Sequence, residues 1–128
     1  MTEWIWLDSE LAEAIHDEQL AEHGGGAGVR DKGALLSALA RPQNLVAYGN
    51  PDAADLASAH AFGVAKNHPF IDGNKRTAWV LARLFLQLNA IDLSFDPVEA
   101  VVMMLSLAAG DLSEDQAAAW FRGRIQRS

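Results

Sequence analysis

The sequence predicts an all-α fold in which about six helices pack around a central buried helix. Apolar residues recur at helical spacing through most of the chain, and residues that can cap a helix precede several of these runs. Sustained alternation of apolar and polar residues, the pattern of a half-buried strand, is missing. The chain of 128 residues is long enough for one domain with its own core. We therefore expect residues 1–128 to form a single domain.

The first two helices are marked by their caps and stops. Asp8 or Ser9 can cap a first helix that ends at the glycines of positions 24–26. Asp31 can cap a short second helix, which Pro42 closes because proline disfavours helical geometry in the residue before it. The glycine-rich stretch between them is interpreted as a linker loop, since no strand precedes it and no phosphate-loop lysine follows. The apolar face predicted for the first helix consists of Leu7, Leu11, Ile15 and Leu20.

Three histidines and one arginine in the first three helices have ordinary structural interpretations. A metal site needs several ligands at compatible spacing, so His16 and His23 are expected to be solvated or capping residues. His60 is predicted to be a helix residue with a satisfied hydrogen bond. Arg41 is interpreted as a cation that matches the dipole at the end of the second helix, and a position near the functional site is kept as the alternative.

The third and fourth helices flank a short turn. The third begins with a capping pair, Asp52 and Asp55. It ends at His68, because Pro69 restricts the residue before it to extended geometry. The fourth helix, about residues 74–88, is apolar almost all round, which is typical of a central buried helix. We expect the functional residues to lie on the turn that joins these two helices.

The last part of the chain predicts two more helices. Residues 91–95 are expected to form a short extended connector, and the run Asp96-Pro97-Val98-Glu99 starts a fifth helix that reaches Gly110. The run Ser113-Glu114-Asp115-Gln116 is a capping box for the sixth helix. We expect this helix to fray in the basic tail, residues 122–127.

Composition and charge exclude several classes of function. A formal net charge of −7 argues against general nucleic-acid binding, which needs a basic surface. No apolar run approaches membrane-spanning length, so we expect no membrane association. The absence of cysteine favours a reduced, cytoplasmic compartment. Positive charge is concentrated between His60 and Ala90, and a cationic region in an acidic chain suits a small anionic ligand such as a nucleotide.

One stretch, residues 67–77, combines residue types that few structural purposes need together. It places His68 and Asp72 just before the run Gly73-Asn74-Lys75-Arg76. Backbone N–H groups of such a turn, and of the helix that starts there, can bind phosphate. Two cations at a helix start oppose the dipole of an empty site and suit a site that holds an anion. The stretch therefore predicts a phosphate-binding turn beside an imidazole and a carboxylate.

The run from His68 to Arg76 resembles the signature of the Fic/Doc family, H-x-F-x-[D/E]-G-N-[G/K]-R. Lys75 in the place of a glycine resembles the Doc (death-on-curing) toxin branch. The resemblance covers nearly the whole chain, because residues 6–15, 28–31, 40–43 and 109–113 also resemble that branch. It implies the Fic fold, with the active-site turn between helices three and four.

The residues of the turn suggest a division of labour in phosphoryl or nucleotidyl transfer to a protein hydroxyl. An imidazole can accept a proton near neutral pH, a hard carboxylate can hold Mg²⁺, and cations can neutralise phosphate oxygens. Phe70 is expected to fix the turn against the core. The expected roles are His68 as the general base, Asp72 as the Mg²⁺ ligand, and Gly73, Asn74, Lys75 and Arg76 as the nucleotide phosphate site.

The resemblance implies transfer of the γ-phosphate of ATP to a target protein, with a translation elongation factor such as elongation factor Tu as the associated kind of target. AMP-transferring Fic enzymes usually carry a second arginine where this chain has Trp79, so AMP transfer is the alternative. Arg83, two helical turns past Arg76, is interpreted as a solvated or core-edge residue, with partial replacement of that arginine as the other option. Two further classes stay open: a nucleotide-binding member without catalysis, and a metal-dependent hydrolase.

The resemblance also implies control by a second protein. Some Fic proteins carry an inhibitory helix with the pattern Ser/Thr-x-x-x-Glu-Gly/Asn. Here Ser9 and Glu13 are followed by Ala14, so the pattern is incomplete. We therefore expect inhibition in trans by an antitoxin, Phd-like or of another kind, that covers the cleft.

Overall fold

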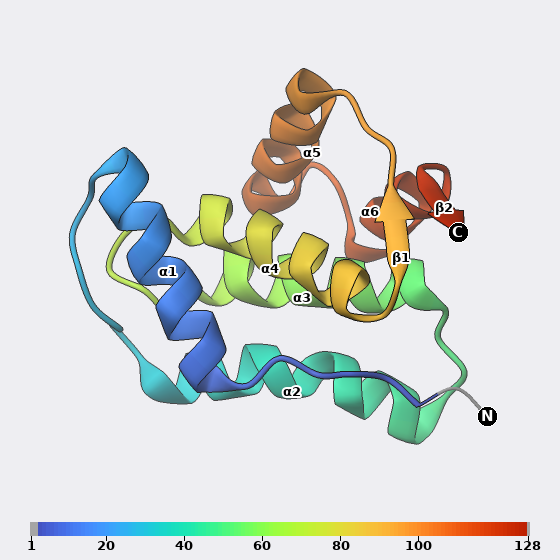
Figure 1. The fold of residues 1–128 in the computed structure, drawn as a ribbon, viewed down its shortest axis with the longest axis horizontal. Helices are drawn as coiled ribbons and strands as arrows, with labels where there is room; N and C mark the ends of the chain where they lie inside the picture. Colours follow the sequence, from blue (N-terminus) through green and yellow to red (C-terminus); the bar gives the residue numbers. More distant parts are fainter. Residues whose placement is uncertain (1–2, 128) are drawn as a thin grey trace.

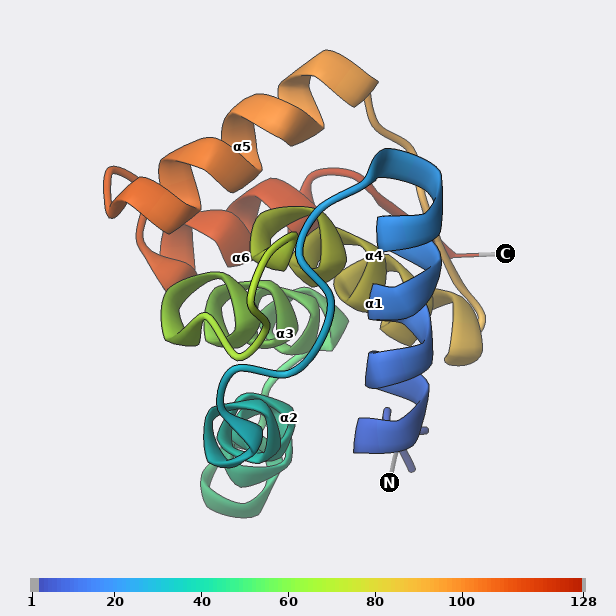
Figure 2. The same cartoon turned by 90° about the vertical axis from the view of Figure 1, so that its left-hand side faces the viewer.

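Two central helices, α3 and α4, lie between α1 and α2 on one side and α5 and α6 on the other (Figures 1 and 2). The computed structural model describes residues 3–127. Their elements are α1 Ser9–His23, α2 Lys32–Tyr48, α3 Ala53–Asn67, α4 Asn74–Leu88, β1 Ile91–Leu93, α5 Pro97–Ala109, α6 Glu114–Arg122 and β2 Ile125–Arg127. The predicted all-α fold of about six helices, with the key turn between the third and the fourth, is confirmed.

The central buried helix is α3, whereas the sequence pattern pointed to α4. Eleven of the 15 residues of α3 are buried, against seven of 15 in α4. The reason is the many small residues of α3, which let neighbouring helices approach closely on several sides. At Gly63, for example, an added Cβ would lie 3.2 Å from the Cβ of Ala38 on α2. Figure 2 shows α3 enclosed by α2, α4 and α6.

The helix starts follow the capping signals of the sequence. The side chains of Asp8, Asp31 and Asp96 each accept a hydrogen bond from a backbone N–H of the first turn that follows. Asp52 and Asp55 form a reciprocal capping box at α3, and Ser113 and Gln116 form another at α6. These boundaries are predictable because a cap depends on residues only three positions apart.

Two predicted ends are wrong. Helix α2 continues through Pro42 to Tyr48, because Pro42 is buried and the turns beyond it pack Leu45 and Val46 against the core. That packing outweighs the lost backbone hydrogen bond of proline. The tail does not fray: β2 pairs antiparallel with β1, with Leu93 opposite Ile125. Pairing with a distant segment satisfies backbone groups that a frayed end would leave to water.

None of the helices in residues 3–127 has both the length and the apolar character needed to span a membrane.

Candidate active site

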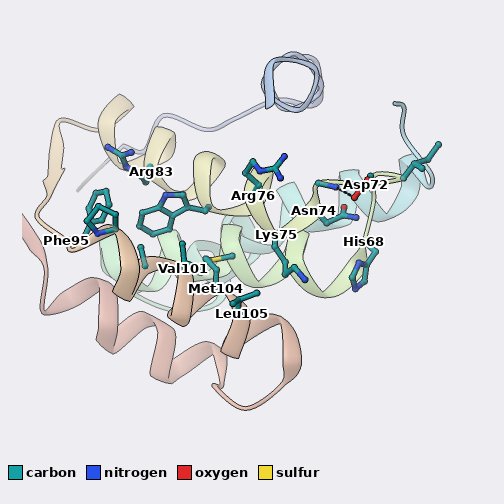
Figure 3. Close-up of a pocket in the computed structure, with 15 residues that line it drawn as sticks. His68, Asp72, Asn74, Lys75, Arg76, Arg83, Phe95, Val101, Met104 and Leu105 are labelled. Atoms are coloured by element: carbon teal, nitrogen blue, oxygen red, sulfur yellow. Dashed lines mark hydrogen bonds between the residues drawn. The ribbon is translucent and has the colours of Figure 1, made fainter. Parts of the chain in front are cut away.

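Loop 68–73 joins α3 to α4 and carries the predicted site residues (Figure 3). His68 ends α3 in the left-handed conformation, with φ 48° and ψ 56°, and its N–H donates to the carbonyl of Val64. The extended geometry predicted from Pro69 is therefore wrong. A left-handed residue closes the last turn of a helix and satisfies its carbonyls, and here that requirement prevails over the preference imposed by proline. The side chain of His68 is exposed at the mouth of a pocket.

The start of α4 has the character of an anion site. Gly73 precedes it with φ 74°, a conformation that glycine adopts without strain, and no side chain caps the first turn. Lys75 and Arg76 are exposed in that uncapped turn. Uncapped N–H groups and the positive end of the helix dipole favour an anion at this position.

Asn74 holds the loop together through its side chain. The Asn74 side-chain oxygen accepts a hydrogen bond from Phe70 N–H, and its amide nitrogen donates to the Phe70 carbonyl, each at 2.9 Å. Phe70 itself is fully buried, as predicted for the residue that fixes the turn. These two bonds orient the Asn74 side chain toward the loop, while its backbone N–H belongs to the uncapped first turn of α4.

Asp72 is exposed and is positioned by backbone donors. Its Oδ1 accepts from the N–H of Gly73 at 2.8 Å, and its Oδ2 accepts from the N–H of Gly26 at 3.4 Å. No cluster of three or more His, Asp or Glu residues that could hold a metal exists within the described residues. Mg²⁺ commonly needs only one or two protein carboxylates, since substrate phosphates and water complete its coordination. The single carboxylate of Asp72 beside an anion site fits such an ion.

A second loop, residues 24–31, clamps loop 68–73. The N–H groups of Arg30 and Asp31 donate to the Pro69 carbonyl, and the N–H of Ile71 donates to the Gly28 carbonyl. The guanidinium of Arg30 donates to the carbonyls of His68 at 2.7 Å and Asn67 at 2.9 Å. The stretch interpreted as a linker is therefore the support of the site. In the sequence, only the run 28–31, which is part of the family resemblance, indicated that this stretch supports the site.

His16 is a buried support of the same loop, not the solvated or capping residue that was expected. Its ring stacks on Phe70 at a centroid distance of 3.9 Å, and its Nε2 lies 2.7 Å from the backbone oxygen of Asp72. Ala12 and Gln19 are buried on the same side of α1, at helical spacing from His16. The helical spacing of Ala12, His16 and Gln19 is the sequence signal that could have predicted a buried His16. His23, in contrast, is exposed.

One pocket, with a volume of about 850 Å³, brings the predicted residues together. His68 and Asp72 lie at one end, Arg83 and Phe95 lie at the other, and Lys75 lies between them (Figure 3). Side chains of α5, including Val101, Met104 and Leu105, form an apolar wall. The volume is in the range of small-molecule and cofactor sites.

The cations of this pocket have no partners. Within residues 3–127, Lys75, Arg76 and Arg83 make no side-chain hydrogen bond or ion pair. The other described Lys and Arg side chains each donate to a carboxylate or a carbonyl: Arg30, Lys32, Arg41, Lys66, Arg122 and Arg124. In a chain of net charge −7, free positive charge therefore gathers in the pocket.

Arg41 and His60 lie outside the pocket. Arg41 donates to Glu114 of α6 at 2.9 Å and stacks over Phe62, and this hydrogen bond raises the pKa of Arg41. It does not line the pocket, and α2 extends well beyond it, so neither sequence interpretation of Arg41 is right. His60 is buried in α3, and its Nδ1 donates to the Leu56 carbonyl at 2.7 Å, which confirms the prediction of a bonded helix residue.

These features define an all-α protein with an uncapped helix start beside an exposed imidazole. A model of the Fic/DOC family matches residues 6–86. The chain is 43% identical over 105 residues to the protein named Toxin Doc of Mycolicibacterium smegmatis, covering 78% of this chain and 80% of that protein. It is 34% identical over 101 residues to the protein named Protein kinase doc of Escherichia phage P1, covering 78% and 79%. The chain belongs to the Fic/DOC family, and the resemblance of the signature is confirmed.

Proposed function

We propose that this protein transfers the γ-phosphate of ATP to a hydroxyl group of a target protein. The observation that carries the proposal is the meeting of an exposed imidazole, a carboxylate and an uncapped helix start with unpaired cations in one pocket. The relative named Protein kinase doc supports the same class of reaction. The size of the pocket accommodates a nucleotide.

In the proposed reaction, the imidazole of His68 accepts the proton of the target hydroxyl. The hydroxyl oxygen forms a bond to the γ-phosphorus while the bond from that phosphorus to the bridging oxygen breaks, and ADP leaves. Lys75, Arg76 and the first N–H groups of α4 neutralise the phosphate oxygens as charge moves onto the leaving group. Asp72 would hold Mg²⁺, which when bound supplies charge neutralisation at the phosphates.

Trp79 supports phosphate transfer over AMP transfer. It stands where AMP-transferring members of the family usually carry a second arginine, and its ring packs against Phe121 and Phe95. An indole in that environment cannot neutralise a second phosphate. AMP transfer remains the competing reaction, and nucleotide binding without transfer is the competing binding function. A hydrolase with three protein metal ligands gains no support from the described residues.

Labelled nucleotide separates these possibilities. The protein would be incubated with a cytosolic extract and with ATP labelled at either the α or the γ position, beside a His68→Ala control. Label from the γ position on a protein band, lost in the control, is the expected result. Label from the α position on protein would overturn phosphate transfer in favour of AMP transfer. ATP binding without any labelled protein would favour the non-catalytic alternative.

We also propose that the protein acts in the cytoplasm as the toxin of a toxin-antitoxin pair. The relative named Toxin Doc supports this role. The incomplete inhibitory pattern at Ser9 and Glu13, followed by Ala14, favours an antitoxin in trans, of the Phd type or another type. Expression of the protein should arrest growth, and expression of His68→Ala should not. Equal growth of the two strains would remove the support for a toxin.

The proposed target is a translation elongation factor such as elongation factor Tu. Purified candidate targets would be treated with the protein, ATP and Mg²⁺, and their intact masses would be measured. Added phosphate on one candidate is the expected result. Added AMP would again point to the competing reaction, and unchanged masses of all translation factors would exclude this target class.

A further inference from the structure

Arg83 lies at the end of the pocket opposite the residues proposed to act on the phosphates. It lies seven residues after Arg76 on α4, a separation of about 10 Å along the helix axis and on nearly the same face. His68 and Asp72 lie at the opposite end of the pocket (Figure 3). Phosphate groups held at the start of α4 would therefore leave Arg83 free for another part of the same ligand.

Aromatic rings hold the guanidinium of Arg83. The Arg83 Cζ lies 4.8 Å from the ring centroid of Phe95 and 5.9 Å from that of Trp79. The two rings meet edge to face at 5.1 Å. A guanidinium held by ring faces is fixed in position, yet its N–H groups keep their capacity to donate.

The absence of a carboxylate beside Arg83 in the described part of the chain is informative because the chain is acidic. A comparable arginine, Arg124, lies 4.2 Å over the ring of Trp120, but it also donates to the carboxylate of Glu99. Within residues 3–127, Arg83 has no such carboxylate, although the protein carries a net charge of −7. Its donors therefore face the pocket and are free to bind an acceptor on a ligand.

We propose that Arg83, Trp79 and Phe95 form the subsite for the base of the nucleoside triphosphate. This inference rests on the proposed function and deepens it. The phosphate tail lies at loop 68–73 and the start of α4, and the purine lies against the apolar and aromatic end of the pocket. Arg83 donates to an acceptor on the purine edge, and the wall of α5, at Val101 and Met104, covers a ring face.

The apolar surroundings favour a base over an acidic side chain of a target protein. A carboxylate needs a cation and water but gains nothing from an apolar wall. A purine has both a flat face that stacks on aromatic or guanidinium planes and ring nitrogens that accept hydrogen bonds.

Binding measurements on the full chain test the subsite. The probes are ATP and inorganic tripolyphosphate, each with Mg²⁺, titrated by calorimetry into wild type, Arg83→Met, Lys75→Met and Arg124→Gln. Methionine keeps the apolar stem, and unchanged thermal midpoints would show that the variants fold. Arg124→Gln is the matched control, because that arginine also stacks on an aromatic ring but lies outside the pocket.

Arg83→Met should weaken ATP binding by about tenfold and leave tripolyphosphate binding within about twofold. Lys75→Met should weaken both probes, and Arg124→Gln neither. Arg83→Lys keeps the charge but loses the planar group, so it should show most of the loss for ATP. Equal weakening of both probes by Arg83→Met, or no weakening of either, would overturn the base subsite while leaving the proposed function standing. Failure of wild type to bind either probe would overturn the proposed function and the subsite with it.

Discussion

The imidazole of His16 on α1 donates a hydrogen bond to the backbone oxygen of Asp72, 56 residues away, over 2.7 Å. A carbonyl oxygen only accepts hydrogen bonds, so the Nε2 of His16 carries a proton in this contact. This bond and the stacking on Phe70 connect the first helix to the residue proposed to hold Mg²⁺.

Removing the His16 ring should lower both stability and activity. His16→Ala leaves a cavity beside Phe70 and an unpaired carbonyl, so we expect a loss of about 2–4 kcal/mol in the free energy of unfolding. The apparent Mg²⁺ affinity in the phosphate-transfer assay should also fall. Urea unfolding and a Mg²⁺ titration of the rate measure the two effects. The exposed His23→Ala is the control, and an unchanged Mg²⁺ dependence in His16→Ala would contradict the positioning role.

Arg30 should affect catalysis more than stability. Its guanidinium holds the carbonyls of His68 and Asn67 from the exposed side of the loop, so Arg30→Ala should lower kcat by about tenfold or more while changing the free energy of unfolding by only about 1 kcal/mol. Arg30→Lys should recover part of the rate. Lys32→Ala, which removes an exposed cation two residues away and its ion pair with Glu13, should leave kcat unchanged.

Gly25 and Gly24 offer a matched pair of substitutions. A Cβ at Gly25 would lie 2.9 Å from Oδ2 of Asp72, whereas a Cβ at Gly24 meets nothing within 4 Å. Both glycines have positive φ, so both alanine variants should lose about 1–2 kcal/mol of stability. Only Gly25→Ala should also displace Asp72 and raise the Mg²⁺ concentration needed for half-maximal rate. Equal Mg²⁺ dependence in the two variants would show that the contact at Gly25 has no effect on the site.

His60 should make the protein less stable in mild acid. Burial lowers the pKa of His60 to about 4, below the value of about 6.5 expected in the unfolded chain. The unfolded state therefore binds the proton first, and stability present above pH 6.5 is lost as the pH falls towards 4, by about 3 kcal/mol in total. Urea unfolding between pH 7 and pH 4 measures the slope. His60→Leu should flatten it, and an identical slope in that variant would assign the loss to other groups.

Asp52 should affect the stability of the protein at a lower pH than His60 does. Its hydrogen bond with Arg122 lowers the pKa of Asp52 to about 2. The contribution of this carboxylate to stability is present above its ordinary pKa of 3.8 and is lost as the pH falls through 2. Asp52→Asn should therefore change the pH dependence of unfolding only below about pH 4. A change in the slope between pH 5 and pH 7 would contradict this assignment.

Local signals in the sequence were sufficient for the helices and for the site loop. The bounds of α4, the capping pair Asp52 and Asp55, and the buried role of Phe70 each depend on residues a few positions apart. The structure gathers His68, Asp72, Lys75 and Arg76 in one pocket, and their chemical roles stay predictions.

Apart from the local geometry of His68, the main errors concern contacts between distant segments. His16 and Arg30 reach the site loop across 56 and 38 residues, so nothing adjacent in the sequence reveals their partners. Helix α2 passes Pro42 because tertiary packing outweighs a local preference. Residues 125–127 form a strand because they pair with β1, which is distant in the sequence.

The position of β2 connects residues 125–127 to the proposed base subsite. Strand β2 pairs with β1. The N–H of Ser94, directly after β1, donates to the carbonyl of Arg124, directly before β2. Phe95 follows directly, so Arg124 and β2 anchor the connector that leads to the aromatic end of the pocket. A premature stop codon at position 124 would leave every signature residue encoded, yet it would release the connector that carries Phe95. We therefore expect a protein truncated there to lose affinity for ATP more than affinity for tripolyphosphate.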